Sequence, residues 1–291
     1  MRRHIVFIKS KFWPTIALVI ALFVGAGVVF ASTLPNSWYQ ARLAKATHTN
    51  ASGTATVAAV AYTSNDKAKT AFTKVKNAVV TVQNLQKSAS LEDGAGAFDS
   101  QNKNTDSNNY QTASQGSGVV LKINKGSADI ITNYHVIENS AAIQVVDANG
   151  DKATATILKS DASQDLALIR VKSTAFKKVA TLADSDKVVT GQNVMAIGSP
   201  LGADYSSTMT KGIVSQAKRS LTANETNNKA VTVIQTDAAI NQGNSGGALI
   251  NDAGQVIGIA SSKITASAQN TNVEGMGFAI PSNQVADFIK S

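Results

Sequence analysis

The segment TDAAINQGNSGGALIN, residues 236–251, contains a glycine-rich loop that joins two apolar stretches. AVTVIQTD at 230–237 runs into the loop and GALIN at 247–251 leads out of it, and both are rich in the aliphatic residues typical of strands. Ser245 lies at the centre of GNSGG, residues 243–247. The segment therefore joins two predicted strands, and Ser245 is either a nucleophile or part of an ordinary turn.

Short runs rich in Val and Ile, bounded by Gly, Asn, Asp and Ser, continue outward from this segment in both directions. Many short strands at this spacing favour a sandwich or barrels over a parallel α/β fold. Short helices are predicted at 66–77 and in the final PSNQVADFIK, and the polar stretch 86–115 is predicted to be a surface loop or a disordered insertion. About twelve strands are predicted, at 78–84, 118–123, 128–133, 142–147, 153–160, 166–172, 193–199, 207–219, 230–237, 247–251, 256–264 and 275–280.

The amino terminus has the pattern of a membrane anchor. Residues 1–14 carry four Lys or Arg residues and no acid, and TIALVIALFVGAGVVFASTL at 15–34 has no charge. About 20 apolar residues suffice to cross a bilayer, whereas a cleavable signal has an apolar core of only about 7–15. We therefore expect a cytoplasmic basic segment at 1–14, an uncleaved transmembrane helix at 15–34, a flexible stalk at 35–65 and a folded domain at 66–291 outside the cytoplasm.

Composition excludes several kinds of chemistry. The chain has no cysteine, so disulfides, thiolate catalysis and cysteine-ligated zinc are excluded, and its three histidines have no helical metal-binding spacing. We expect neither a metal nor a cofactor. The formal charge of +8 suits an anionic surface, but no nucleic-acid motif accompanies it, and we expect no nucleic-acid partner.

GNSGG also matches the G-x-S-x-G nucleophile elbow of the α/β-hydrolases. In those enzymes the acid and the histidine follow the serine in the chain. No histidine follows Ser245, so the order of residues excludes this interpretation.

A serine needs an adjacent base to act as a nucleophile. Within the β-rich region the only histidine is His135, in IITNYHVIEN, directly after an apolar strand. An acid must then orient the imidazole. Asp165 ranks first because it directly precedes the strand LALIRV, and Asp161 ranks second. The other candidates between His135 and Ser245 are Asp147, Asp151, Asp184, Asp186, Asp204 and Asp237.

The segments TNYHVI, QDLALIRV, AIGSPLG, TKGIVS, IQTDAAINQGNSGGALIN and GFAIPSN occur in this order. Together they resemble the HtrA/DegP family of trypsin-like serine proteases over about residues 70–289. The resemblance implies an all-β fold of two six-stranded antiparallel barrels, with His135, Asp165 and Ser245 as the catalytic triad and the N–H groups of Gly243 and Ser245 as the oxyanion hole. It also implies a substrate pocket near Ile240, Ile259 and Ser261, which has no acid to select Lys or Arg.

The chain also differs from the family pattern. Members commonly carry PDZ modules after the protease domain, whereas this sequence stops at Ser291, as expected of a member without a PDZ module or of a fragment. The resemblance implies a homotrimer. We expect a membrane-anchored serine endopeptidase that acts outside the cytoplasm on misfolded or exported polypeptides. The alternative is a non-catalytic or latent chaperone-like binding protein on the same fold.

Overall fold

The computed structural model describes residues 67–87, 110–200, 202–222, 230–267 and 275–291. None of the helices in these ranges is long and apolar enough to cross a membrane. The expected span at 15–34 and the expected stalk at 35–65 lie outside the described residues, which all belong to one compact unit, 65–291.

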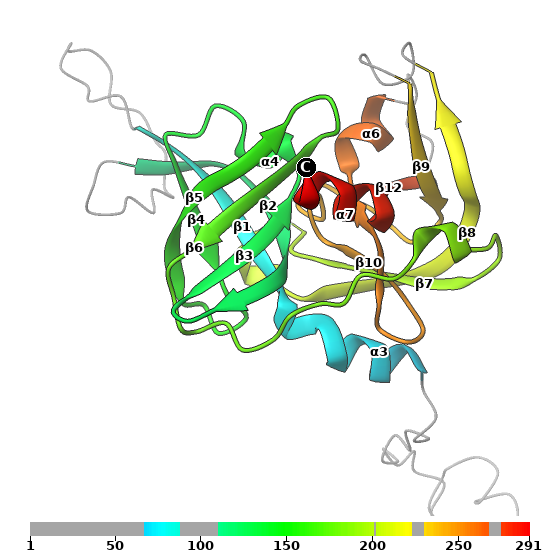
Figure 1. Cartoon of the computed structure of the whole chain (residues 1–291), viewed down its shortest axis with the longest axis horizontal. Coiled ribbons are helices and arrows are strands. Elements are labelled where there is room, and N and C mark those ends of the chain that lie inside the picture. The colour runs from blue at the N-terminus through cyan, green and yellow to red at the C-terminus, as the bar shows by residue number, and fades with distance from the viewer. Residues whose placement is uncertain (1–66, 88–109, 201, 223–229, 268–274) are drawn as a thin grey trace, which may run out of the picture. The chain divides into compact units, whose positions relative to one another are not determined.

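Six antiparallel strands close the first barrel in the order β1-β2-β3-β6-β5-β4 (Figure 1). Their Val- and Ile-rich sequences favour extended backbone, because β-branched side chains pack well on a pleated surface. In β6, for example, Ala167, Ile169 and Val171 are fully buried. The strands are β1 (Val79–Lys87), β2 (Tyr110–Asn124), β3 (Ser127–Thr132), β4 (Ala142–Val146), β5 (Lys152–Asp161) and β6 (Leu166–Val171).

A second closed barrel follows with the order β7-β8-β9-β12-β11-β10, which repeats the connectivity of the first. The fold class expected from the sequence, two six-stranded antiparallel barrels, is confirmed. The strands are β7 (Asn193–Gly198), β8 (Thr208–Leu221), β9 (Val231–Thr236), β10 (Ala248–Asn251), β11 (Val256–Ala260) and β12 (Gly277–Pro281).

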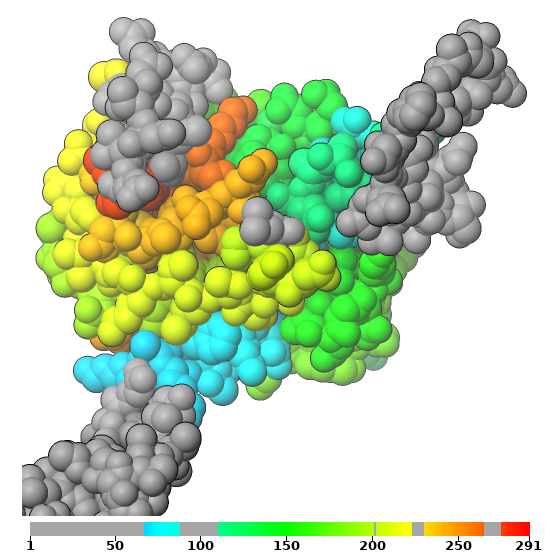
Figure 2. Space-filling model, turned by 180° about the vertical axis from the view of Figure 1, so that it is seen from behind, coloured from blue at the N-terminus to red at the C-terminus, as the bar shows by residue number. Residues whose placement is uncertain are grey.

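Helices connect and cover the barrels. The two longest, α3 (Lys67–Val75) and α7 (Ser282–Lys290), match the two helices predicted from the sequence. The apolar face of α3 packs into the cluster that spans both barrels, and Figure 2 shows this helix, in cyan, along one edge of them. The shorter helices are η1 (Lys76–Ala78), α4 (Tyr134–Ile137), η2 (Ser185–Lys187), η3 (Ala203–Tyr205) and α6 (Ser262–Ser267).

Three strand boundaries predicted from the sequence are wrong. β1 runs on to Lys87 and β2 begins at Tyr110, so both strands extend into the stretch predicted as a loop at 86–115. Pairing explains this difference, because antiparallel partners continue from Val79 and Val119 out to Lys87 and Tyr110. The strand predicted at 256–264 ends at Ala260 and is followed by α6.

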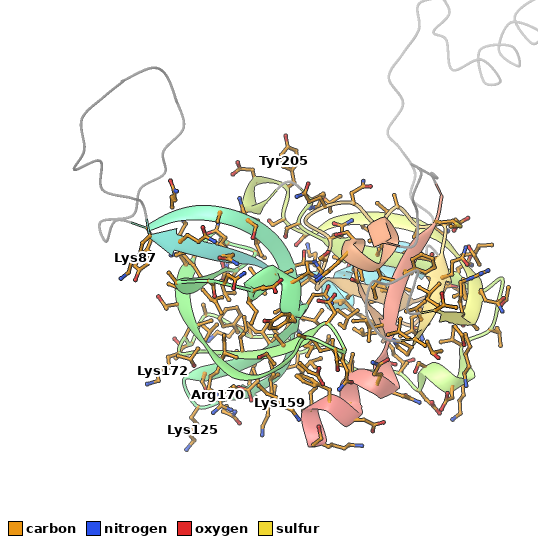
Figure 3. The ribbon with its side chains drawn as sticks, turned by 90° about the horizontal axis from the view of Figure 1, so that it is seen from above. Lys87, Lys125, Lys159, Arg170, Lys172 and Tyr205 are labelled. Atoms are coloured by element: carbon orange, nitrogen blue, oxygen red, sulfur yellow. The ribbon has the colours of Figure 1, made fainter. Side chains whose placement is uncertain are left out.

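Basic side chains lie along one side of the first barrel. Figure 3 shows Lys125, Lys159, Arg170 and Lys172 along this side. Two of them have structural partners. Arg170 donates to both carboxylate oxygens of Asp129 at 2.6 and 2.9 Å, and the Lys159 ammonium donates to the Phe288 carbonyl near the end of α7 at 2.8 Å.

Candidate active site

The three residues expected to form the triad come from three connections. His135 lies on α4, directly after β3, and Asp165 directly precedes β6, so both belong to the first barrel. Ser245 lies between β9 and β10 of the second barrel. Because strands β3 and β6 pair, with Thr132 opposite Ala167, the His135 and Asp165 connections lie at the same end of the barrel.

His135 and Asp165 form a close pair. The imidazole Nδ1 lies 2.9 Å from each carboxylate oxygen, and the His135 N–H donates to Asp165 Oδ1 at 3.1 Å. The two side chains are 18% and 14% exposed. A carboxylate at Nδ1 holds the proton on that nitrogen, which leaves Nε2 as the acceptor that a general base requires.

The position of Asp165 is fixed from both sides. Its backbone has φ +55°, a region that few residues other than glycine adopt. Within the first barrel, Asn133 Nδ2 donates a hydrogen bond to its carbonyl at 2.8 Å. From the second barrel, Ser261 Oγ donates to Asp165 Oδ2 at 3.0 Å. The carboxylate therefore bridges both barrels while it faces the imidazole.

Asp161, the second-ranked acid, has a different role. Its carboxylate accepts bonds from the backbone N–H and side chain of Ser163 and of Gln164, all within 3.2 Å. The side chains of Ser163 and Gln164 are the main cause that lowers the pKa of Asp161 to about 2. Asp161 therefore stabilises the turn that leads into Asp165, and it makes no hydrogen bond to His135.

We expect Asp165→Asn to lower kcat for peptide hydrolysis by about 10⁴-fold, because an amide stabilises the wrong imidazole tautomer. Asp161→Asn is the matched control, since it removes a neighbouring charge, and its kcat is expected to change by less than about threefold. Steady-state kinetics on a fluorogenic peptide measure both. A loss with Asp161→Asn as large as that with Asp165→Asn would contradict the assignment of the acid.

The nucleophile loop depends on glycine where it meets the first barrel. Gly246 has φ +84°, and a Cβ there would collide with the Ser117 carbonyl. Its N–H donates to the Ala260 carbonyl at 2.9 Å, which ties the loop to the end of β11. Asn244 is 2% exposed, and its side-chain Nδ2 donates to the Ala239 carbonyl at 3.4 Å. This hydrogen bond stabilises the loop internally.

Ser245 Oγ is not bonded to His135. Among the described residues its partners are Ser262, whose hydroxyl lies 2.6 Å away and whose N–H donates to it at 3.0 Å. Ser262 begins α6, where the sequence predicts a strand, so it is not among the site residues predicted from the sequence. The side chain of Ser245 is largely enclosed, since the residue is only 3% exposed.

The residues proposed for the substrate pocket lie in different surroundings. Ile240, 8% exposed, belongs to the apolar cluster of the second barrel, and a Cβ at Gly277 would contact its side chain. Ile259 is fully buried in β11 opposite Ala248. Ser261 faces Asp165, as described above. The assignment of these three residues to a substrate pocket stays a prediction.

The described site contains the groups for acyl transfer and lacks a metal cluster. In the ranges that the structure describes, no three His, Asp or Glu side chains are grouped so that they could hold a metal ion. Gly243, with φ +93°, and Ser245 present backbone N–H groups that donate to no other described group. A nucleophile, an oriented imidazole and two free amides are the components that peptide-bond hydrolysis through an acyl intermediate requires.

Comparison with known proteins gives one matching family and several similar proteins. Residues 116–259 match the trypsin-like peptidase domain. "Serine protease Do-like HtrA" of Lactococcus lactis subsp. cremoris is 41% identical over 273 residues, which cover 92% of this chain and 65% of that protein. A protein of the same name from Bacillus subtilis is 43% identical over 212 residues, 72% of this chain and 44% of that protein.

A further relative is described as a "Probable periplasmic serine endoprotease DegP-like" protein, from Buchnera aphidicola subsp. Schizaphis graminum. It is 40% identical over 185 residues, which cover 63% of this chain and 36% of that protein. The chain thus spans less than two thirds of the length of each of these relatives.

Proposed function

Since this chain carries a trypsin-like peptidase domain and is a homologue of the Do-like HtrA serine proteases, we propose that it is a serine endopeptidase. Ser245 attacks the scissile carbonyl, His135 takes its proton and returns it to the leaving amine, and Asp165 stabilises the imidazolium. The observation that carries the proposal is the His135–Asp165 pair, at 2.9 Å, positioned on the barrel that faces the nucleophile loop.

The proposed substrates are misfolded or exported polypeptides outside the cytoplasm. Ile240, in an apolar environment without an acid, supports cleavage after aliphatic residues. The apolar run at 15–34 with its basic flank supports a single membrane anchor, and the periplasmic protease among the relatives is consistent with this location. A homotrimer is part of the same proposal.

Incubation of the full-length chain in detergent micelles with unfolded casein and with a compact folded protein tests this proposal. We expect cleavage of casein and slow or no cleavage of the folded protein. Alkaline extraction of membranes tests the anchor, and release of the chain into the soluble fraction would contradict it. Binding of casein without cleavage under any condition would favour the non-catalytic alternative.

A latent protease is the second candidate, and the Ser245–Ser262 contact favours it. In this arrangement the hydroxyl that should bond to His135 is held by α6. Activation then requires the start of α6 to move away from the nucleophile.

Ser262→Ala is therefore expected to accelerate labelling of the chain by a fluorophosphonate. The hydroxyl contact is worth about 0.5–1.5 kcal/mol, which corresponds to an increase in rate of about 2–10-fold. Lys263→Ala, an exposed neighbour on α6, is the control and should leave the rate unchanged. An unchanged rate in a folded Ser262→Ala protein would show that this contact does not restrain Ser245.

A further inference from the structure

The peptide between Gly243 and Asn244 is held at both ends. Its carbonyl accepts a hydrogen bond from Ser117 Oγ at 2.7 Å, and its N–H donates to the Asn241 carbonyl at 3.0 Å. The carbonyl bond comes from β2 of the first barrel, whereas the N–H bond stays within the loop. The orientation of this peptide is therefore fixed by a side chain 126 residues away in the sequence.

This peptide lies between the two amides proposed as the oxyanion hole. Gly243 N–H and Ser245 N–H belong to the peptides on either side of it. The middle peptide shares the α-carbons of Gly243 and Asn244 with these neighbouring peptides, so its fixed orientation restrains the directions of both donors. Rotation of the middle peptide would separate them.

Ser117 itself is firmly anchored. It is fully buried, its N–H donates to the Ser245 carbonyl at 2.7 Å, and its carbonyl accepts from Thr132 Oγ1 at 2.6 Å. Its hydroxyl accepts from the Ser199 N–H at 2.9 Å. A hydroxyl has one proton, and because this N–H is a donor, the proton is directed to the Gly243 carbonyl.

The close approach depends on a neighbouring glycine. A Cβ at Gly198 would lie 2.9 Å from Ser117 Oγ and 2.7 Å from Asn244 Oδ1, both too close for ordinary contacts. The absence of a side chain at Gly198 lets the first barrel reach the nucleophile loop directly.

We propose that Ser117 is a positioning residue that fixes the oxyanion hole through the Gly243 carbonyl. The proposal rests on the endopeptidase function proposed above. Ser117 touches no reacting atom, and its hydroxyl acts by holding the middle peptide of the loop. Its loss should therefore weaken binding of the transition state more than binding of the substrate.

The test compares Ser117→Ala with the wild type in the full-length chain. We expect kcat on a fluorogenic peptide to fall about 10–100-fold while KM changes less than about threefold, because a displaced donor loses much of its effect. The inhibition constant of a peptide boronic acid, whose tetrahedral adduct uses the oxyanion hole, is expected to rise by a similar factor. Ser117→Thr keeps the hydroxyl and should recover most of kcat.

Ser282→Ala is the matched control. Ser282 is also fully buried, and its hydroxyl donates to a backbone carbonyl, that of Ala183, at 2.6 Å. Thermal melts should show lower stability for both alanine variants, but only Ser117→Ala should lose kcat and boronate affinity. An active wild type with unchanged kcat and boronate affinity in Ser117→Ala would overturn the positioning role. An equal loss in Ser282→Ala would also overturn it. An inactive wild type would instead contradict the proposed function.

Discussion

Replacement of Ser245 by alanine is expected to lower kcat for peptide hydrolysis by about 10⁶-fold, to a residual rate set by binding and the oxyanion hole alone. Ser262, at 2.6 Å from Ser245 Oγ, is the nearest alternative nucleophile, but its hydroxyl lies at the start of α6 and outside the glycine-rich loop.

Cleavage of casein by the two proteins at equal concentration measures this effect. Ser220→Ala, which removes an exposed hydroxyl from β8, is the control and should retain the wild-type rate. Binding of casein to Ser245→Ala should be unchanged, because the substitution removes one small polar atom. Cleavage by Ser245→Ala at the wild-type rate would exclude Ser245 as the nucleophile.

His135→Ala is expected to be nearly as damaging, with a fall in kcat of about 10⁶-fold, because the members of a triad act as a unit. For the same reason the double variant with Ser245→Ala should be no slower than either single variant. Independent contributions would multiply, so a further large loss in the double variant would contradict a shared mechanism.

The control for His135 is His48→Ala. His48 lies in the stalk that the sequence predicts, so its loss should leave the rate unchanged. Steady-state kinetics at pH 7–8 measure the four variants and the wild type. Retention of turnover by His135→Ala would show that another group is the base.

Much of the fold could be predicted because local pattern and tertiary packing agree. Strands such as β3 and β6 are mostly buried and rich in aliphatic residues, among them Ile130, Ile131 and Ile169. The strand pattern alone left a sandwich or barrels open, because the two halves share strand order without a recognisable sequence repeat, and the division into two barrels was predicted only from the family resemblance. The extension of β1 and β2 also escaped prediction, because polar strand ends such as Lys87 and Tyr110 are defined by pairing and not by burial.

The site was predictable to a different degree for each residue. His135 and Ser245 are conspicuous as the lone histidine of the β region and the serine of GNSGG. For the acid, the sequence offered both Asp165 and Asp161. Only the structure shows that the Asp161 carboxylate accepts hydrogen bonds from Ser163 and Gln164 in its own turn. Ser117 and Ser262 carry no sequence signal, because their roles depend on contacts between segments far apart in the chain.

The geometry points to a site that is only partly assembled. The acid and base are paired and the middle peptide of the nucleophile loop is clamped, whereas Ser245 Oγ is held by α6. If the first two features are permanent, activation needs only a local change at the start of α6. The regulation of such a protease would then act on one short segment.

Identification of the residue that reacts with a fluorophosphonate tests the central claim most directly. The full-length chain is labelled, digested and analysed by mass spectrometry, with casein cleavage followed in parallel. We predict a single adduct on Ser245 whose formation abolishes cleavage and which is lost in His135→Ala. An adduct on another residue, or full cleavage by a chain completely labelled at Ser245, would contradict the account.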